Sequence, residues 1–386
     1  MASSQVPVWL DCDPGHDDAF AILLAAYHPN IKLLGITSVF GNASIENTTR
    51  NAAALLTAMG KHNDIPLYVG HGKPLDRPAL HAPTEIHGAS GLDGTDLLPT
   101  PLCAPSSEPG VDAMAAALKA QPPGTAWIVA TGALTNVGAL FRKYPELVAH
   151  VRGLSLMGGA IGAGFSDAPL GKSNVQQDCA GNWTQWAEFN ILVDPEAAAD
   201  VFHNKEIAKK TIIAPLDLTH QVRATPDVKD LLLYGKSGKS GANGEAGKST
   251  LRKLLVELLY FFSKTYADVF GIADGPPLHD PIAVAAVLGG IPGSIPFFQW
   301  DATRSQSPQH RERFEVTVIT DGLFEEAEQK QTGRTIAKKC PIGEEGVTIP
   351  RGLDVPKFWT VIEDCLERAD DANKVFESRE RETARI

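Results

Sequence analysis

The sequence lacks the features of several protein classes. It contains only five cysteines in 386 residues, and none of them forms a CxxC pair. This argues against a disulfide framework and against a zinc knuckle. Positive charge is also scarce, since 35 lysines and arginines stand against 46 aspartates and glutamates, for a formal net charge of −11. Such an acidic surplus opposes binding to a phosphate backbone, so we expect no nucleic acid as a partner.

Long apolar runs and a secretory signal are missing as well. No stretch approaches the roughly 18 apolar residues that a membrane span needs. The opening residues, MASSQVPVWL, show no basic segment ahead of an apolar core, so no signal peptide is expected. We therefore expect no membrane association and a cytoplasmic protein, with presence in the nucleus left open.

Strand-like and helix-like segments alternate along the chain. Apolar segments that predict buried strands lie at residues 6–10, 31–40, 67–69, 126–130, 154–157 and 211–214. Segments with helical spacing of apolar side chains lie at residues 17–27, 45–59, 111–120, 136–141 and 195–202. Wholly apolar strands separated by helices predict an α/β fold: an open, mostly parallel central sheet with helices on both faces, as in Rossmann-like proteins.

We expect one domain over residues 1–386, since the chain has no clear linker and no internal repeat. Insertions are expected near residues 71–109, 159–181 and 235–249, which are rich in Gly, Pro or polar residues. The third contains Gly-Lys-Ser, but Ala242 occupies the place of a required glycine, which argues against a phosphate-binding loop. Further on, residues 313–320 predict a half-exposed strand and residues 354–368 a helix, followed by a charged tail.

The strongest chemical signal is DCDPGHDD, which places four carboxylates within residues 11–18, where the first strand ends. Carboxylates this close repel each other, and a cation is the simplest compensation. Oxygen ligands of this kind suit calcium or magnesium. Taken singly, Asp17 or Asp18 could instead favour the start of a helix, and Asp11 could support the ligands from behind.

Polar residues also follow other predicted strands and begin other helices. They are Asn42 in VFGN, Thr135 and Asn136 in GALTN, Asn182, Glu188 and Asn190 in GNWTQWAEFN, and His279 and Asp280 in HDPIAVA. Each alone has a structural explanation as a helix cap, a turn residue or a packed core residue. Ligands of such sheets bind outside the carboxyl ends of the strands, so we expect these residues to converge there.

Six motifs in this order resemble the inosine–uridine-preferring nucleoside hydrolases. They are DCDPGHDDA, VFGN, GALTN, LMGGA, AEFNILVDPEAA and HDPIAVA, over about residues 6–288. The resemblance implies that family's fold and calcium-dependent hydrolysis of the N-glycosidic bond of ribonucleosides, such as uridine or inosine, for nucleoside salvage. The insertions are similar to those of fungal uridine nucleosidases. Assembly as a homodimer or homotetramer is also implied.

The resemblance further implies a role for each matching residue. A calcium ion would be held by Asp13, Asp18, the backbone carbonyl of Thr135 and Asp280. The substrate would be held by Asp17, Asn42, Asn182, Glu188 and Asn190, with Phe189 stacked on the base. His87 would close over the substrate from the loop at residues 85–94.

Cleavage of the glycosidic bond builds positive charge on the ribose, which nearby carboxylates stabilise. Asp13 is the expected general base for the attacking water. His279 is the expected general acid for the departing base, since an unperturbed histidine titrates near ~6.5. Tyr266 is expected either to stack on the base or to pack in the core. His16 is expected to be a surface histidine or to perturb the neighbouring carboxylates.

Two alternative functions share part of this pattern. Phosphatases of the haloacid dehalogenase type also carry DxD after the first strand, but Pro14 stands where they have Thr or Val, and HDPIAVA stays unexplained. A protein that binds calcium or nucleosides without turnover would require loss of a catalytic group. The chain retains Asp13, Asp18, His279 and Asp280.

Overall fold

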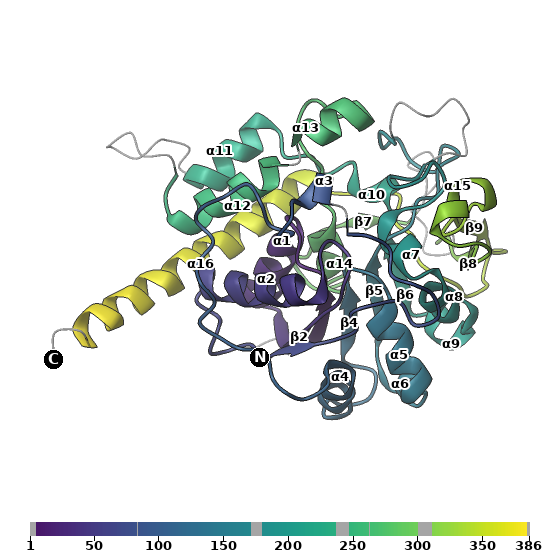
Figure 1. The fold of residues 1–386 in the computed structure, drawn as a ribbon, viewed down its shortest axis with the longest axis horizontal. Coiled ribbons are helices and arrows are strands. Elements are labelled where there is room, and N and C mark those ends of the chain that lie inside the picture. The colour runs from purple at the N-terminus through teal and green to yellow at the C-terminus, as the bar shows by residue number, and fades with distance from the viewer. Residues whose placement is uncertain are drawn as a thin grey trace.

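The computed structural model describes residues 5–82, 84–170, 180–236, 247–261, 263–299 and 311–383. Its main sheet has six parallel strands in the order β3-β2-β1-β4-β5-β6 (Figure 1). They are β1 (Val6–Cys12), β2 (Ile31–Ser38), β3 (Leu67–Val69), β4 (Trp127–Ala130), β5 (Gly153–Met157) and β6 (Thr211–Ala214). The predicted α/β fold with an open parallel sheet is confirmed. The order of winding reverses between β1 and β4, and such a switch point opens a crevice at the strand ends.

Helices cover both faces of this sheet. One face carries α1 (Asp18–Tyr27), α2 (Ile45–Ala58), α12 (Thr250–Phe261), α14 (Asp280–Ala286) and α16 (Val355–Thr383). The other carries α4 (Gly110–Lys119), α5 (Thr135–Lys143), α6 (Leu147–His150), α8 (Pro195–His203) and α9 (Lys205–Ala208). Successive side chains of β1 alternate between the two apolar cores, since Val8 and Leu10 join the first and Trp9 the second.

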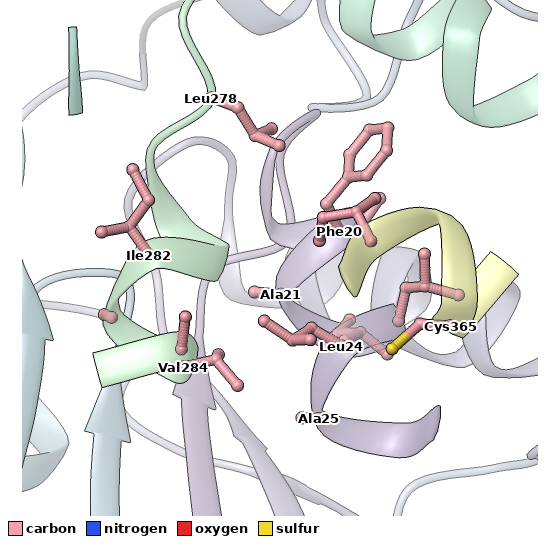
Figure 2. Close-up of a cluster of buried hydrophobic side chains, with 14 of the residues drawn as sticks. Phe20, Ala21, Leu24, Ala25, Leu278, Ile282, Val284 and Cys365 are labelled. Atoms are coloured by element: carbon pink, nitrogen blue, oxygen red, sulfur yellow. The ribbon is translucent and has the colours of Figure 1, made fainter. Parts of the chain in front are cut away.

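Helix α1 is central to the first core. Its sequence DAFAILLAAY is apolar on all sides, as expected of a helix that is surrounded by other elements. Figure 2 shows Phe20 and Leu24 of α1 among side chains of α14, such as Ile282, and of α16, such as Cys365. This packing fixes the first residues of α1 and α14, which are Asp18 and Asp280.

Shorter elements complete the fold. The remaining helices are α3 (Thr84–His87), α7 (Phe189–Val193), α10 (Leu216–Thr219), α11 (Pro226–Tyr234), α13 (Ser263–Thr265), the π-helix η1 (Tyr266–Phe270), the 3-10 helix η3 (Phe324–Glu326) and α15 (Ala327–Lys330). Two antiparallel pairs join β7 (Phe297–Phe298) to β10 (Gly352–Leu353) and β8 (Phe314–Val318) to β9 (Thr335–Lys339). The predicted half-exposed strand at residues 313–320 is therefore confirmed as β8.

The predicted end of the last helix is wrong. We expected a helix at residues 354–368 and then a charged tail, whereas α16 continues to Thr383 and extends beyond the neighbouring elements (Figure 1). The added segment contains neither glycine nor proline and is rich in good helix formers. Within the described residues, no helix is long and apolar enough to cross a membrane. Parts of two predicted insertions, residues 171–179 and 237–246, lie outside the described residues.

Candidate active site

A cavity of about 680 Å³, its open mouth included, brings together residues from distant parts of the chain. Its lining comprises Asp17, Asn42, Ile86, His87, Thr131, Met157, Asn182, Trp183, Glu188, Phe189, Asn190, Thr265, Tyr266, Phe270, His279 and Asp280. All seven of the substrate-contacting residues expected from the sequence are in this set. Polar groups and aromatic rings share the lining, as in pockets that bind a small polar molecule with an aromatic part.

Three buried carboxylates meet at this cavity. Asp17, Asp18 and Asp280 each place one oxygen within 4.8 Å of those of the other two. Burial, reinforced by the charges of its neighbours, raises the pKa of Asp17 to about 7 and that of Asp280 well above its usual range. Ionising all three together therefore requires a compensating positive charge. The group can bind a metal ion, and its oxygen-only chemistry matches a hard cation.

Asp13 lies next to this cluster and is fully buried. Its Oδ2 accepts a hydrogen bond from the Asn42 backbone N–H at 2.8 Å, whereas its Oδ1 has no hydrogen-bond partner among the described residues. A Cβ at Gly41 or at Gly132 would approach the Asp13 carboxylate within 2.1 and 2.5 Å, so both positions require glycine. A buried carboxylate oxygen normally has a partner, so the chemistry of Asp13 Oδ1 fits that of a metal ligand.

The structure does not bring Thr135 into the cavity. Thr135 is the first residue of α5, and its hydroxyl donates to Oδ2 of Asp194 at 2.7 Å. Thr131, directly after β4, lines the cavity instead, and its hydroxyl donates to Oδ1 of Asp18 at 2.8 Å. The sequence carried a signal for Thr131, because it is the first polar residue after a predicted strand.

The segment around α7 supplies one polar wall of the cavity. Glu188 caps α7 by accepting from the backbone N–H groups of Asn190 and Ile191, and it also accepts from that of Gly159. Asn190 donates through Nδ2 to the carbonyls of Thr131 and Met157, at 2.8 and 3.3 Å. The Asn190 Oδ1 thereby remains to accept a hydrogen bond from a ligand.

Asn182 and Phe189 complete this wall. Oδ1 of Asn182 accepts from the Phe189 backbone N–H at 2.9 Å, which fixes the orientation of the amide. The Phe189 ring packs against Trp183 with centroids 5.1 Å apart. Trp183 is a lining residue that the sequence did not single out, since it falls within a segment with no regular periodicity.

His279 is held at both ring nitrogens. Its Nδ1 shares a hydrogen bond with the hydroxyl of Thr219, and its Nε2 shares one with the hydroxyl of Tyr266, both at 2.7 Å. Burial lowers the pKa of His279 well below its usual 6.5, with the neighbouring histidines adding to the effect. Tyr266 thus lies in the cavity and contacts His279, where the sequence had left open whether it was only a core residue.

The expectation that His16 is a surface histidine is wrong. The ring is fully buried, because Phe261 of α12 and His87 of α3 stack beside it with centroid distances of 5.0 and 5.1 Å. These covering residues are far away in sequence, so the polar surroundings of His16 in the motif gave no sign of them. Burial lowers the pKa of His16 to about 4. His87 lines the cavity, as expected from the sequence.

Comparisons with known proteins indicate the family to which this chain belongs. Residues 8–360 match the family model described as inosine-uridine preferring nucleoside hydrolase. The chain is 39% identical to the uridine nucleosidase of Saccharomyces cerevisiae, over 97% of this chain and 100% of that protein. It is 38% identical to a pyrimidine-specific ribonucleoside hydrolase of Salmonella arizonae, over 73% of this chain and 79% of that protein.

A solved plant nucleoside hydrolase has a similar structure. It superposes with a TM-score of 0.71 at 26% identity, covering 94% of this chain and 98% of that one. The family match spans the sheet, the carboxylate cluster and the cavity. The chain therefore belongs to the inosine–uridine-preferring nucleoside hydrolase family.

Proposed function

We propose that this protein is a calcium-dependent hydrolase of the N-glycosidic bond of ribonucleosides, with uridine as its first candidate substrate. The observation that carries the proposal is the meeting of Asp17, Asp18 and Asp280 at one end of a cavity that also contains Tyr266 and His279. Membership of the family supports the reaction, and similarity to the yeast uridine nucleosidase supports the choice of uridine. The phosphatase alternative has no support from these comparisons.

The oxygen donors available fit a calcium ion. Asp18 and Asp280 offer carboxylate oxygens at the cluster, and Oδ1 of Asp13 has no hydrogen-bond partner in the described part of the chain. We propose the backbone carbonyl of Thr131 as the further ligand, and not that of Thr135, because Thr131 lines the cavity beside Asp18. A bound calcium ion would act as a Lewis acid and would orient the ribose hydroxyls and the attacking water.

The polar walls would hold the ribose. Asp17 faces the cavity and can accept from a sugar hydroxyl, as can Oδ1 of Asn190. Asn182 and Glu188 both accept backbone hydrogen bonds from the start of α7, and we assign them to the 5′-hydroxyl. Asn42 lies next to Asp13, to which its backbone N–H donates. Ionised carboxylates near the ring stabilise the positive charge that develops as the bond breaks. Asp13 would accept a proton from the water.

The aromatic side would receive the base. Phe189 offers a ring for stacking, and the hydroxyl of Tyr266, backed by His279, can supply a proton to the departing base. Protonation matters because the base leaves with negative charge. Assembly as a homodimer or homotetramer and a cytoplasmic location stay predictions from the sequence.

A direct assay tests the reaction. Purified protein in calcium would be incubated with uridine, cytidine, inosine, adenosine and nicotinamide riboside, and free ribose measured as reducing sugar. We expect release from uridine above the others. Folded, calcium-loaded protein that frees ribose from none of them would contradict the proposal and favour a non-catalytic binder.

Two aspartate variants test the metal site. Asp18→Asn should weaken calcium binding and lower kcat/KM by at least about 10²-fold, since a charged ligand in the cluster is lost. Asp227→Asn, an exposed aspartate in the first turn of α11, is the matched control and should behave as the wild type. Calorimetric calcium titration and ribose release measure the two effects. Unchanged calcium affinity in Asp18→Asn would exclude Asp18 as a ligand.

A further inference from the structure

Two histidines and a backbone carbonyl form a chain of hydrogen bonds behind one wall of the cavity. Nδ1 of His16 lies 2.9 Å from Nδ1 of His87, and Nε2 of His16 lies 2.8 Å from the carbonyl oxygen of Asp93. His16 is fully buried, whereas His87 lines the cavity. This series of hydrogen bonds therefore connects the carbonyl of Asp93 to the ring of His87, which a substrate in the cavity can contact.

The carbonyl of Asp93 sets the direction of these bonds. A carbonyl only accepts, so Nε2 of His16 must carry its hydrogen. Because a neutral imidazole carries one ring N–H, Nδ1 of His16 is then bare and can only accept. His87 must therefore donate from Nδ1, which leaves its own Nε2 without a hydrogen. Both rings are neutral, since His16 is fully buried and shares one hydrogen bond with His87, and a positive charge on either ring of such a pair is disfavoured.

The packing holds the rings in this arrangement. Phe261 stacks on His16 with ring planes 13° apart, and His87 lies near-parallel to His16 at 21°. A Cβ at Gly15 would approach both Cε1 and Nδ1 of His87 within 2.9 Å, so the glycine lets the His87 ring lie against the backbone. Neither ring can turn over without losing a hydrogen bond and these contacts. The tautomer is thus fixed together with the orientation.

The remaining nitrogen of His87 has no hydrogen-bond partner among the described residues. We propose that His16 is a positioning residue that holds His87 in its Nδ1–H tautomer, so that His87 offers a hydrogen-bond acceptor to an N–H or O–H donor of the bound nucleoside. This inference rests on the proposed function. The opposite tautomer would offer a donor and would favour a carbonyl of the base, so His16 influences which groups the cavity accepts.

Two donors of uridine fit this chemistry, the N3–H of the base and the 5′-hydroxyl of the ribose. The analogue 3-methyluridine lacks the first and 5′-deoxyuridine lacks the second. Each analogue leaves the other donor intact, so comparing them identifies the group that His87 meets.

Spectroscopy of the full-length protein tests the tautomer without any substrate. Labelling with ¹⁵N-histidine, and assignment of the His87 signals by comparison with His87→Asn, gives the protonation of each ring nitrogen. We expect a protonated Nδ1 and a bare Nε2 for His87 in the wild type. His16→Phe keeps a stacking ring but removes both nitrogens, and should release His87 into a mixture or into the other tautomer. His16→Asn places an acceptor oxygen where Nδ1 stood, and should restore the wild-type pattern. A wild-type His87 with its hydrogen on Nε2 would overturn the proposal.

Kinetics tests the consequence for the substrate. In the wild type, one of the two analogues should lose about tenfold or more in kcat/KM relative to uridine, the usual size for a lost hydrogen bond to a buried partner. That loss should shrink severalfold in His16→Phe and return in His16→Asn, because the coupling between residue 16 and the substrate group is what changes. If the wild type, His16→Phe and His16→Asn lose the same factor of kcat/KM on each analogue relative to uridine, the proposed contact between His87 and the substrate is overturned.

The two readouts separate this inference from the proposed function. If no nucleoside releases ribose although His87 has the expected tautomer, then the proposed function fails and the acceptor role falls with it. If uridine is cleaved but His87 carries its hydrogen on Nε2, then only the present inference fails.

Discussion

Tyr266 and His279 are the two side chains from which we infer the route of a proton to the departing base. Both ring nitrogens of His279 are engaged with hydroxyls, those of Thr219 and Tyr266, so the ring cannot contact a base through nitrogen while these bonds persist. The hydroxyl of Tyr266, which also lines the cavity, is therefore the better placed donor. We propose that His279 orients this hydroxyl through the hydrogen bond at its Nε2.

We predict that Tyr266→Phe lowers kcat for uridine by about 10²-fold, the lower end of what a lost general acid costs. Hydrolysis of p-nitrophenyl riboside should change far less, because nitrophenolate leaves without protonation. Steady-state kinetics on both substrates gives the comparison. Tyr144→Phe, at the end of α5, is the control and should leave both rates unchanged. Equal losses on the two substrates would instead assign Tyr266 a role in shaping the cavity.

At the residue scale, the sequence predicted the carboxylates well and their surroundings less well. Asp17, Asp18 and Asp280 were predictable because each stands at a strand end or a helix start. Thr135 was expected as a ligand but begins α5, while Thr131 reaches the cavity. The signal that favours Thr131 is its place as the first polar residue after a predicted strand, whereas Thr135 was chosen from the resemblance. The burial of His16 could not be predicted either, since it depends on side chains contributed by distant helices.

At the scale of elements, α16 is joined to α12 by a buried cluster of charges. Arg252 is fully buried and contacts Glu363 at 2.7 Å and Asp370 at 2.6 Å, with the Leu232 carbonyl as a further acceptor at 2.8 Å. Removal of one member of such a cluster leaves its partners charged and without compensation.

Arg252→Leu should therefore lower the free energy of unfolding by about 3–5 kcal/mol. The neighbouring Lys253 is exposed and pairs loosely with Glu257 at 3.7 Å, so Lys253→Leu should change it by less than about 1 kcal/mol. Urea denaturation followed by circular dichroism measures both values. A similar small loss for both variants would mean that the buried cluster contributes little to docking of α16.

The strands were more predictable than the short helices. All six strands of the main sheet coincide with predicted apolar segments, because a buried parallel strand needs a continuous apolar run. The π-helix η1 carries Tyr266 but has only five residues, too few to show a helical period. The sequence therefore could not predict that residues of η1 line the cavity, and only the structure shows their position.

For the whole molecule, the buried acids make stability depend on pH and on metal. Burial raises the pKa of Asp11 from 3.8 to about 8 and that of Asp17 to about 7. A carboxyl group whose pKa is raised in the folded state stabilises the fold at low pH, and that contribution is lost as the pH rises through the folded value.

The metal-free protein should accordingly melt at progressively lower temperature as the pH rises from about 5.5 to about 8.5. Each proton lost in this way changes the free energy of unfolding by up to about 1.4 kcal/mol per pH unit, or about 2–4 °C in a large domain. Calcium should raise the melting temperature more at pH 8.5 than at pH 5.5, because binding requires ionised carboxylates. Thermal scans in EGTA and in calcium chloride test this. A melting temperature of metal-free protein that stays constant or rises over this interval would contradict the raised pKa values of these carboxyl groups.

The switch point between β1 and β4 also has a consequence for biosynthesis. The predicted ligands are far apart in the sequence, since Asp13 and Asp18 follow β1 and Asp280 begins α14. A growing chain on the ribosome thus has no complete cluster until residue 280 of 386 has been added and has emerged. If these residues bind calcium as proposed, the ion would not assist the early steps of folding during synthesis. It would bind only after the sheet has assembled and α14 has packed beside α1.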